Sequence, residues 1–400
     1  MTGRLLFEVV LQESPKKIIE RRKIMTTTTI YFPCEQIERY CNEAFIRFGF
    51  TEDEAKIITD VLLLADLYGI KSHGTQRLVR YHKSIKNGSV KVDAKPEIIF
   101  ETPVSAVIDG HAGMGQLVAY FAMELAIKKA QDVGMAFVTV RNSNHYGIAG
   151  YYTKMACDRG FISISTTNTE SIAVHTGSKQ ALLGSNPIAF AMPAEPYPFW
   201  FDAATTVVPR GKLEVCNKED RPLASGWAIG EDGAVSQNAA HVLHCINDKV
   251  GTGGILPVGG NTEAMGSHKG YGFSMIAELL SAITSGGATS NHHVRKPGVG
   301  AGSCHAFIVI DPKIFGDPEE QKHHLSVFLQ ELRDAKRVDD YVPIYTHGEK
   351  EWNSLERVKR EGIGINIHTF DEMIDICNYL GMDRTEYFGD ADASDVNIEI

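Results

Sequence analysis

The stretch Met135-Ala136-Phe137-Val138-Thr139-Val140 decides the fold class of this chain, because an unbroken run of apolar and β-branched residues indicates a buried strand. Residues 118–130 before it are apolar at helical spacing, and Gly134 is placed to end that helix. A polar loop at 141–147 follows, and after it come a second helix and a second strand at 161–165. Helix, strand, loop, helix and strand in this order predict an α/β domain.

The same pattern continues toward the carboxyl terminus. Further strands are expected at 188–192, 200–202 and 306–310, and an apolar helix is expected after the glycine-rich residues 266–272. Residues 215–262 are polar and rich in glycine, so we expect long surface excursions there.

The amino-terminal part has a different, helical character. Thr51 and Glu54 have the spacing of a capping box, and the apolar helical face that follows ends at Gly69. We therefore divide the chain into three parts. They are an extension at 1–24 compatible with disorder, a helical substrate or cap module at 25–110 joined by 322–400, and an α/β domain at 111–321.

Composition narrows the class of protein. The chain has 400 residues, of which 43% are hydrophobic and 22% charged, and its net charge of -10 argues against binding nucleic acid. No apolar run is long enough to predict a membrane-spanning helix. The seven cysteines contain no Cys-x-x-Cys pair, which favours reduced thiols in an intracellular protein.

His73 and Arg77 are the first candidate site residues. If their stretch is helical, the four-residue spacing places both on one face. Arginine can clamp a carboxylate through two parallel hydrogen bonds, and histidine can exchange a proton with a neighbouring hydroxyl near neutral pH. The alternative is a surface histidine and arginine near a helix start, which these residues alone do not exclude.

Polar residues at strand ends supply further candidates. His145 lies in the loop at the carboxyl end of the first strand, where open α/β sheets place their ligands. Thr169 follows the second strand, whereas the Asp202 segment ends another strand, and small residues beside Asp202 would allow close approach of a ligand. Lys269, bracketed by glycines before a helix, would favour an anionic group.

Several familiar enzyme signatures do not occur in the sequence. There is no Gly-x-Gly-x-x-Gly, no phosphate loop, no Gly-x-Ser-x-Gly and no His-Glu-x-x-His. The adjacent pairs His292-His293 and His323-His324 are poor metal ligands, so we expect no metal. A hydrolase using Ser72 and His73 is a remote alternative, because adjacent residues rarely reach each other as nucleophile and base.

Several motifs occur together in a fixed order. They are Ser72-His73-Gly74-x-x-Arg77, Asn144-His145-Tyr146-Gly147, Gly184-Ser185-Asn186-Pro187, Phe201-Asp202-x-Ala204-Thr205 and Gly266-x-His268-Lys269-Gly270-Tyr271-Gly272. The chain thereby resembles the type 2 malate/L-lactate dehydrogenase family. The resemblance implies a homodimeric oxidoreductase that uses NAD or NADP and has a mixed-sheet α/β fold of its own, unlike a Rossmann fold. Together with the reduced thiols, we expect a cytoplasmic protein.

The resemblance also implies roles for residues. His73 would be the acid/base with His145 orienting the substrate or sharing the proton, and Arg77 and Tyr81 would hold a carboxylate. The expected cofactor contacts are Thr169, Asp202, Ala203, Ala204, Lys269, Gly270, His347, Gly348 and Glu349. His347 stands where the family commonly has proline, so that last loop departs from the pattern.

The substrate implied is a 2-hydroxy or 2-oxo acid, with malate and oxaloacetate first. Lactate, sulfolactate, ureidoglycolate and cyclic imino acids are the alternatives within the family, and a member that binds cofactor without turnover is another. A second carboxylate would need a further cation, for which Arg80 and Arg141 are the candidates.

Overall fold

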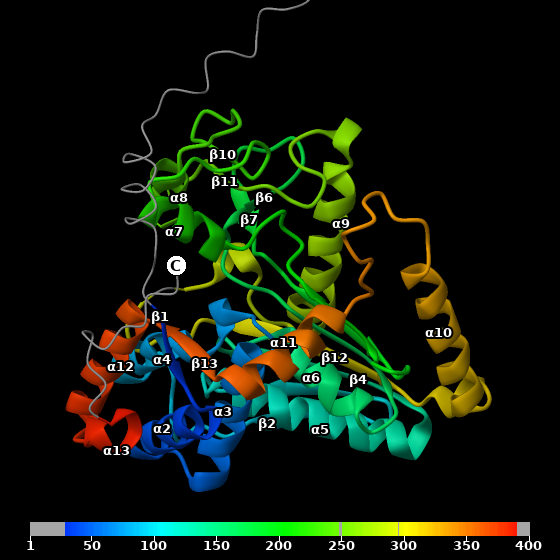
Figure 1. Ribbon diagram of the computed structural model, residues 1–400, viewed down its shortest axis with the longest axis horizontal. Helices are drawn as coiled ribbons and strands as arrows, with labels where there is room; N and C mark the ends of the chain where they lie inside the picture. Colours follow the sequence, from blue (N-terminus) through cyan, green and yellow to red (C-terminus); the bar gives the residue numbers. More distant parts are fainter. Residues whose placement is uncertain (1–28, 248–249, 295, 390–400) are drawn as a thin grey trace, which may run out of the picture.

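A computed structural model describes residues 29–247, 250–294 and 296–389 (Figure 1). The expected extension at 1–24 and the last residues, 390–400, lie outside the described residues. No helix of the described part is long and apolar enough to cross a bilayer. Nor do three or more histidine, cysteine or acidic side chains gather as a metal site within the described ranges.

A seven-stranded mixed sheet forms the centre of the molecule (Figure 1). Its spatial order is β2-β3-β4-β12-β5-β8-β9, and every neighbouring pair is antiparallel except β3 with β4. The strands are β2 (Glu97–Thr102), β3 (Ser105–Asp109), β4 (Met135–Ser143), β5 (Ile162–Thr167), β8 (Ile188–Met192), β9 (Phe199–Ala203) and β12 (Ser303–Ile310). The α/β class with a mixed sheet is confirmed.

This order places four strand ends at one edge of the sheet. Because β12 is antiparallel to both β4 and β5, those two strands point the same way, and β3 and β9 share their direction. His145 and Thr169 follow the carboxyl ends of β4 and β5, and Asp202 and Ala203 are the last two residues of β9. Residues far apart in the sequence therefore lie at the same end of the sheet, where these strands terminate.

Two helices pack on this sheet with a shared core. They are α5 (Gly115–Val133) and α6 (Ala149–Cys157), and small residues such as Ala119, Ala122 and Ala126 let α5 lie close to the strands. Gly134 ends α5 in a left-handed conformation, as the sequence predicts.

The amino- and carboxyl-terminal segments together build a helical region (Figure 1). The antiparallel pair β1 (Thr29–Phe32) and β13 (Ile363–Asn366) joins them. The helices are α2 (Cys34–Arg47), α3 (Glu52–Leu67), α4 (Leu78–Lys86), α12 (Ile367–Leu380) and α13 (Arg384–Phe388). The expected capping box at Thr51 and Glu54 is present at the start of α3.

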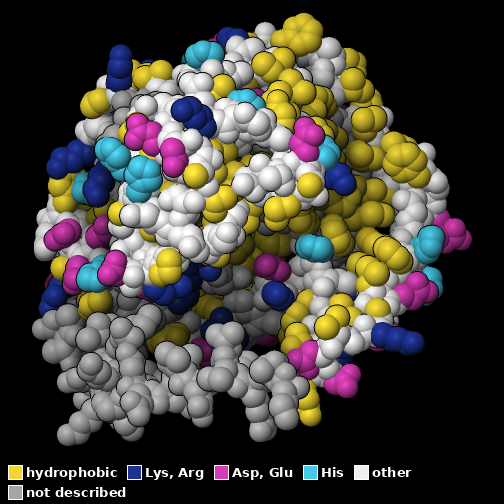
Figure 2. Space-filling view, turned by 90° about the horizontal axis from the view of Figure 1, so that it is seen from above, with side chains coloured by type: hydrophobic (Ala, Val, Ile, Leu, Met, Phe, Trp, Pro, Cys, Tyr) yellow, Lys and Arg dark blue, Asp and Glu magenta, His cyan; other side chains and the backbone are white. Residues whose placement is uncertain are grey.

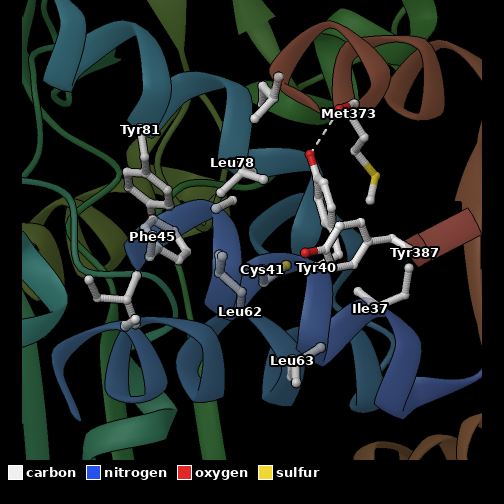
Figure 3. Packing of buried hydrophobic residues seen from close by; sticks show 14 of the residues in the cluster. Ile37, Tyr40, Cys41, Phe45, Leu62, Leu63, Leu78, Tyr81, Met373 and Tyr387 are labelled. Carbon is white, nitrogen blue, oxygen red and sulfur yellow. Dashed lines mark hydrogen bonds between the residues drawn. The ribbon is translucent and has the colours of Figure 1, made fainter. Parts of the chain in front are cut away.

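A single hydrophobic cluster holds this region together (Figure 3). Tyr40 donates a hydrogen bond to the carbonyl oxygen of Met373 at 3.0 Å, which links α2 to α12. Tyr81 on α4 lies beside Phe45 at the edge of the cluster (Figure 3). This packing holds the Tyr81 ring in place, and its hydroxyl contacts His145.

Two further helices complete this part of the fold. Helix α10 (Pro318–Arg333) stands apart at the side of the molecule, where Lys322 pairs with Glu195 at 2.7 Å (Figure 1). Helix α11 (Glu349–Glu361) contacts α3.

The prediction of surface excursions at 215–262 is wrong. This region and its neighbours form a small layer with its own core, which includes Leu213, Val242 and Ile255. Its elements are β6 (Ala173–Val174), β7 (Ala181–Leu183), α7 (Arg210–Lys218), β10 (Ala228–Ile229), α8 (Ala239–Asn247) and β11 (Gly254–Ile255). The apolar residues are too widely spaced among glycines for their periodicity to be recognised in the sequence.

Candidate active site

His73 and Arg77 do not lie on one continuous helix, so that expectation is wrong. Two short 3-10 turns, Lys71–His73 and Thr75–Arg77, are separated at Gly74, and α4 begins only at Leu78. The break gives this stretch a fixed bend instead of a helical face.

Asp66 near the end of α3 causes this bend. Its carboxylate accepts a hydrogen bond from the Thr75 amide at 2.7 Å and another from the Thr75 hydroxyl. A Cβ atom at Gly74 would lie only 1.9 Å from an Asp66 oxygen, so only glycine fits there. Burial raises the pKa of Asp66 to about 6, although both bonds from Thr75 lower it.

The bend brings His73 against His145. Their imidazole rings stack with centroids 5.5 Å apart and planes 22° apart. The hydroxyl of Tyr81 lies 2.7 Å from Nδ1 of His145. His73, Tyr81 and His145 therefore form one group of side chains in contact.

The loop that carries His145 is shorter than the sequence suggests. Arg141, Asn142 and Ser143 belong to β4, because they continue its pairing beside β12. The amide of Asn144 then donates to the carbonyl oxygens of Ala112 and Gly113, both at 2.9 Å. These bonds anchor the loop directly before His145.

The contacts of His145 favour one tautomer. The main-chain N–H of Gly147 points at Nδ1 over 3.4 Å, and an N–H can only donate. Nδ1 therefore acts as an acceptor, which makes the Tyr81 hydroxyl a second donor to it. In the neutral imidazole the proton is then on Nε2, where it can be donated to a substrate oxygen.

Burial and positive charge keep both imidazoles neutral. Burial first, and then the guanidinium groups of Arg77 and Arg80, lower the pKa of His73 to about 3. The pKa of His145 is held well below its usual value by burial first and then by Arg80, His73 and Arg77. Neutral imidazoles can accept a proton from a hydroxyl group.

Ser72 lies closer to His73 than the sequence argument allows. Its hydroxyl is 2.9 Å from Nδ1 of His73, so the expectation that these neighbours do not reach each other is wrong. The Nε of Arg77 donates to the carbonyl oxygen of Ser72, which fixes the same turn from the other side.

The two arginines considered for a second carboxylate have different surroundings. Arg141 is engaged with Asp109, at 3.0 Å from Nε to Oδ2. Arg80 is exposed and lines a cavity of about 310 Å³ together with Tyr81, His145 and Lys296. Arg80 is thus the arginine that faces open space beside the histidines.

A buried acidic residue organises the loop that carries Thr169. The Glu278 carboxylate accepts hydrogen bonds from the amides of Asn168 and Asn186 and from the amide and hydroxyl of Ser290. Asn186 in turn accepts a bond from the Thr169 amide at 3.0 Å. Glu278 was not foreseen from the sequence, because an acidic residue inside an apolar helix carries no motif.

Asp202 caps a helix. Its carboxylate accepts a hydrogen bond from the Gly150 amide at 2.7 Å, at the start of α6, although it comes from β9. Burial raises its pKa to about 7, and main-chain bonds from Gly150 and Ala149 oppose that rise. Ala203 and Ala204 follow it at the sheet edge and are partly exposed.

Lys269 lies inside a helix and not before it, so its placement in the sequence analysis is wrong. Helix α9 spans Ser267–Glu278, and Gly266 precedes it in a left-handed conformation. Lys269 is exposed in the first turn, while Gly270 is packed so tightly on Val258 that a Cβ would lie 2.0 Å from its carbonyl oxygen.

The segment from His347 to Glu349 is held by neighbouring side chains. The His347 ring lies 5.3 Å from that of Phe201, and its carbonyl oxygen accepts a bond from the Trp200 amide at 3.2 Å. Gly348 has a φ of +102°, and Glu349 is buried and paired with Arg333 at 2.6 Å. The Glu349 carboxylate therefore has a structural partner already.

Comparison with known proteins agrees with this geometry. The model of the malate/L-lactate dehydrogenase family matches residues 32–374. A malate dehydrogenase of Pyrococcus horikoshii is 40% identical over 354 residues, which are 88% of this chain and 96% of that protein. An L-sulfolactate dehydrogenase of Methanocaldococcus jannaschii is 36% identical and covers 85% of this chain and 94% of its own.

The solved structures support the same conclusion. The malate dehydrogenase of Entamoeba histolytica superposes with a TM-score of 0.85 at 32% identity, over 89% of this chain and 99% of its own. The fold and the site define a hydroxy-acid dehydrogenase. The chain belongs to the malate/L-lactate dehydrogenase family, and it is an enzyme of the nicotinamide-dependent malate/lactate type.

Proposed function

We propose that this enzyme interconverts malate and oxaloacetate, with His73 as the acid/base and Arg77 as the clamp for the carboxylate beside the reacting carbon. The observation that carries this proposal is the stacked pair of neutral imidazoles, His73 and His145, beside two arginine side chains. A 2-hydroxy acid offers a hydroxyl for the imidazoles and a carboxylate for the guanidinium groups.

In the oxidation direction the neutral Nε2 of His73 would accept the hydroxyl proton of malate. Its Nδ1 is occupied by the Ser72 hydroxyl, so Nε2 is the ring atom left for substrate. His145 would donate its Nε2 proton as a hydrogen bond to the same oxygen and hold it in place. A nicotinamide cofactor, when bound, would supply the hydride chemistry in both directions.

In the reduction direction a proton has to be loaded first. Arg77 and Arg80 lower the pKa values of both histidines, and substrate carboxylates would neutralise those two cations. Binding of oxaloacetate would therefore raise the histidine pKa values and draw in the proton that the carbonyl oxygen receives.

The second carboxylate of malate separates it from lactate. Arg80 supports this part of the proposal, because it lines the cavity beside His145 whereas Arg141 is paired with Asp109. Lys296 on the same wall adds a second positive charge. The malate dehydrogenase relatives at 40% and 39% identity favour the same substrate.

The residues fit a dinucleotide cofactor. The exposed ammonium of Lys269 at the start of α9 suits a phosphate, and the Thr169 hydroxyl at the end of β5 can bond a ribose or phosphate oxygen. The small side chains of Ala203 and Ala204 leave room beside Asp202. We propose NAD or NADP held by these residues and Gly270, with His347, Gly348 and Glu349 bounding the site.

We also propose a homodimer. Helix α9 and the π-helical turn after it expose a stripe of large apolar side chains, which are Phe273, Ile276, Leu279 and Ile283. Helix α10 exposes Val327, Phe328 and Leu332 across from it, and Figure 2 shows hydrophobic side chains gathered where these two helices lie. Such a surface is typical of a protein–protein interface.

Two further assignments complete the proposal. We keep the helical region as a substrate or cap module and the sheet region as the cofactor domain, with 97–109 moved to the sheet that they join. The seven free thiols support a reducing compartment, for which we propose the cytoplasm.

The test is the change in nicotinamide absorbance with NADH and NADPH against oxaloacetate, pyruvate, a sulfonated 2-oxo acid and a cyclic imine. We expect turnover with oxaloacetate well above pyruvate. Preference for another substrate would overturn malate but keep the hydride chemistry, and no turnover with any of them would overturn the proposed function.

A further inference from the structure

We propose that His305 is a positioning residue that ties the loop of His145 to the loop of Thr169 through its two ring nitrogens. His305 lies on β12, the strand between β4 and β5 in the central sheet. The loops of His145 and Thr169 follow β4 and β5, so a side chain on β12 can reach the ends of both strands. The proposal rests on the proposed function only in the roles that it gives to these two loops.

Both ring nitrogens of His305 are hydrogen-bonded inside the protein. Nε2 lies 2.9 Å from the hydroxyl of Ser143, two residues before His145. Nδ1 lies 2.8 Å from the hydroxyl of Thr167, two residues before Thr169. The side chain of His305 is fully buried, and Ser143 and Thr167 are buried as well. His305 therefore has no ring nitrogen left for a substrate and acts through its neighbours.

The surroundings of Thr167 determine the direction of both bonds. Its hydroxyl also lies 2.8 Å from the carbonyl oxygen of Cys304 and 2.9 Å from that of Asn168, and a carbonyl oxygen can only accept. Because the single hydroxyl proton goes to a carbonyl oxygen, Nδ1 of His305 donates to Thr167. The pKa of His305 is lowered to about 3, mainly through burial, so the ring is neutral. Nε2 then accepts the proton of the Ser143 hydroxyl.

The bond to Ser143 crosses an irregularity in the pairing of β4 with β12. Ser303 of β12 pairs with Ser143. His305, two residues later, pairs with Val140, three residues earlier, so β4 carries one extra residue there. Asn142 lies in this bulge with a φ of +54°. A bulge interrupts the ladder and re-aims the residues beside it, so a side-chain bond from β12 holds the strand end where the ladder does not.

The ring of His305 also holds the residue that follows His145. It stacks on the ring of Tyr146 with centroids 4.4 Å apart and planes 4° apart. Tyr146 is buried, and its carbonyl oxygen accepts a hydrogen bond from the Tyr152 hydroxyl at 2.6 Å. His305 thus contacts the chain both before and after His145, while its other nitrogen bonds the end of β5.

Two replacements of His305 separate the two bonds. The amide of His305→Asn reaches the place of Nδ1, so it can keep the bond to Thr167 and loses the bond to Ser143. The longer side chain of His305→Gln reaches the place of Nε2, so it can keep the bond to Ser143 and loses the bond to Thr167. The variants are compared in the full chain by kcat, by the Kd for NADH and NADPH from nicotinamide fluorescence, and by the ring 15N signals of labelled histidines.

The two replacements should have opposite effects. We expect His305→Asn to lower kcat about tenfold and to shift the ring signals of His145, with the cofactor Kd changed by less than about threefold. We expect His305→Gln to raise the cofactor Kd about tenfold, with kcat changed by less than about threefold and the signals of His145 in place.

Three further variants control the experiment. Ser143→Ala and Thr167→Val remove the same two bonds from the other side, and each should reproduce one of the two results if a replacement of His305 prevents folding. Ser163→Ala is the matched control, because it removes a buried bond of 2.8 Å to the carbonyl oxygen of Thr153 from the same sheet. It should lower the melting temperature and leave kcat, the cofactor Kd and the signals of His145 unchanged.

The parent chain gives a test that needs no variant, since the ring 15N shifts of His305 should show its proton on Nδ1. A proton on Nε2 would overturn the proposal. A loss of kcat and of cofactor binding together in both replacements, in step with the melting temperature, would overturn it as well, because a purely structural role predicts that result.

A parent chain that binds neither NADH nor NADPH, or turns over none of the 2-oxo acids, would overturn the proposed function instead. The proton of His305 and the ring signals of His145 would still decide this inference, because neither depends on turnover.

Discussion

The imidazole rings of His73 and His145 stack with their centroids 5.5 Å apart, although one follows α3 and the other follows β4. Each ring is also held by a hydrogen bond of its own. Ser72 bonds Nδ1 of His73, and Tyr81 bonds Nδ1 of His145, so each ring has one nitrogen left for a substrate. Two neutral imidazoles with separate anchors can take separate roles.

Replacing His73 by alanine should show whether His73 or His145 is the acid/base. We expect His73→Ala to lower kcat on the order of 10²-fold or more, the usual scale of general acid/base catalysis. We expect His145→Ala to raise KM as well, since that ring orients the oxygen. Steady-state rates in both directions measure this, and near-normal turnover of His73→Ala would move the acid/base role to His145.

The dependence of kcat/KM on pH for malate oxidation should show no ionisation of His73 near neutral pH. Burial and the neighbouring arginines lower the pKa of His73 to about 3, so the free enzyme keeps this base unprotonated near neutral pH. We expect kcat/KM for malate oxidation to show no inflection near pH 6.5 that can be assigned to His73. An acidic limb centred there that disappears in His73→Ala would contradict the assignment.

Arg80 should determine the preference for a dicarboxylate. Arg80→Leu removes the cation beside the cavity, and a hydrogen bond to a charged group contributes roughly 1.5–3 kcal/mol. We expect kcat/KM for oxaloacetate to fall on the order of 10- to 100-fold, and that for pyruvate to change much less. Arg141→Leu is the matched control, since that side chain is bound to Asp109. Equal losses for both substrates would exclude this role of Arg80.

Asp66 should make stability depend on pH in the direction opposite to most carboxylates. Its pKa is about 6 in the folded protein, mainly through burial, against about 3.9 unfolded, so the folded state binds the proton more tightly. The stability from this group is complete below pH 4 and is lost as the pH rises through 6. The loss is about 2–3 kcal/mol by proton linkage.

Urea unfolding of the protein and of Asp66→Asn between pH 4 and pH 8 measures this difference. The difference isolates Asp66 from the buried histidines, whose lowered pKa values act in the opposite sense. We expect the parent protein to lose stability relative to Asp66→Asn as the pH rises. A difference that does not vary with pH would show that Asp66 is not buried as a proton-binding group.

Gly74→Ala should disrupt the turn that carries the site. The new methyl group would meet the Asp66 carboxylate at 1.9 Å, and a carboxylate held by Thr75 cannot move aside. We expect a loss of more than about 10-fold in kcat/KM together with a lower melting temperature. Gly211→Ala is the comparison for stability, because nothing lies within 4 Å of its added Cβ. Equal melting temperatures for the two variants would contradict this account.

Local patterns in the sequence predicted much of the fold. The capping box at Thr51 and the glycine stop at Gly134 formed as expected, because both depend on residues within one turn of a helix. The strand at 188–192 is found at the predicted residues, because a short apolar run indicates a buried strand locally. Where the pattern is short and interrupted by glycine, as around Val242 and Ile255, the core between distant segments could not be recognised.

The candidate site was only partly predictable. Motif order selected His73, Arg77, Tyr81 and His145, and the structure brings these residues together. Asp66 and Glu278 had no sequence signal, since a single polar residue on an apolar helix face does not reveal its partner.

By itself, the sequence determined the α/β class, the helical ends and the family, because these follow from residue types at short spacing and from motifs in a fixed order. Only the tertiary structure decided the bend at Gly74, the tautomer of His145 and the choice of Arg80 over Arg141 as the free cation. Each of these depends on a contact between residues far apart in the chain. Such contacts arise from packing in three dimensions, which local periodicity does not encode.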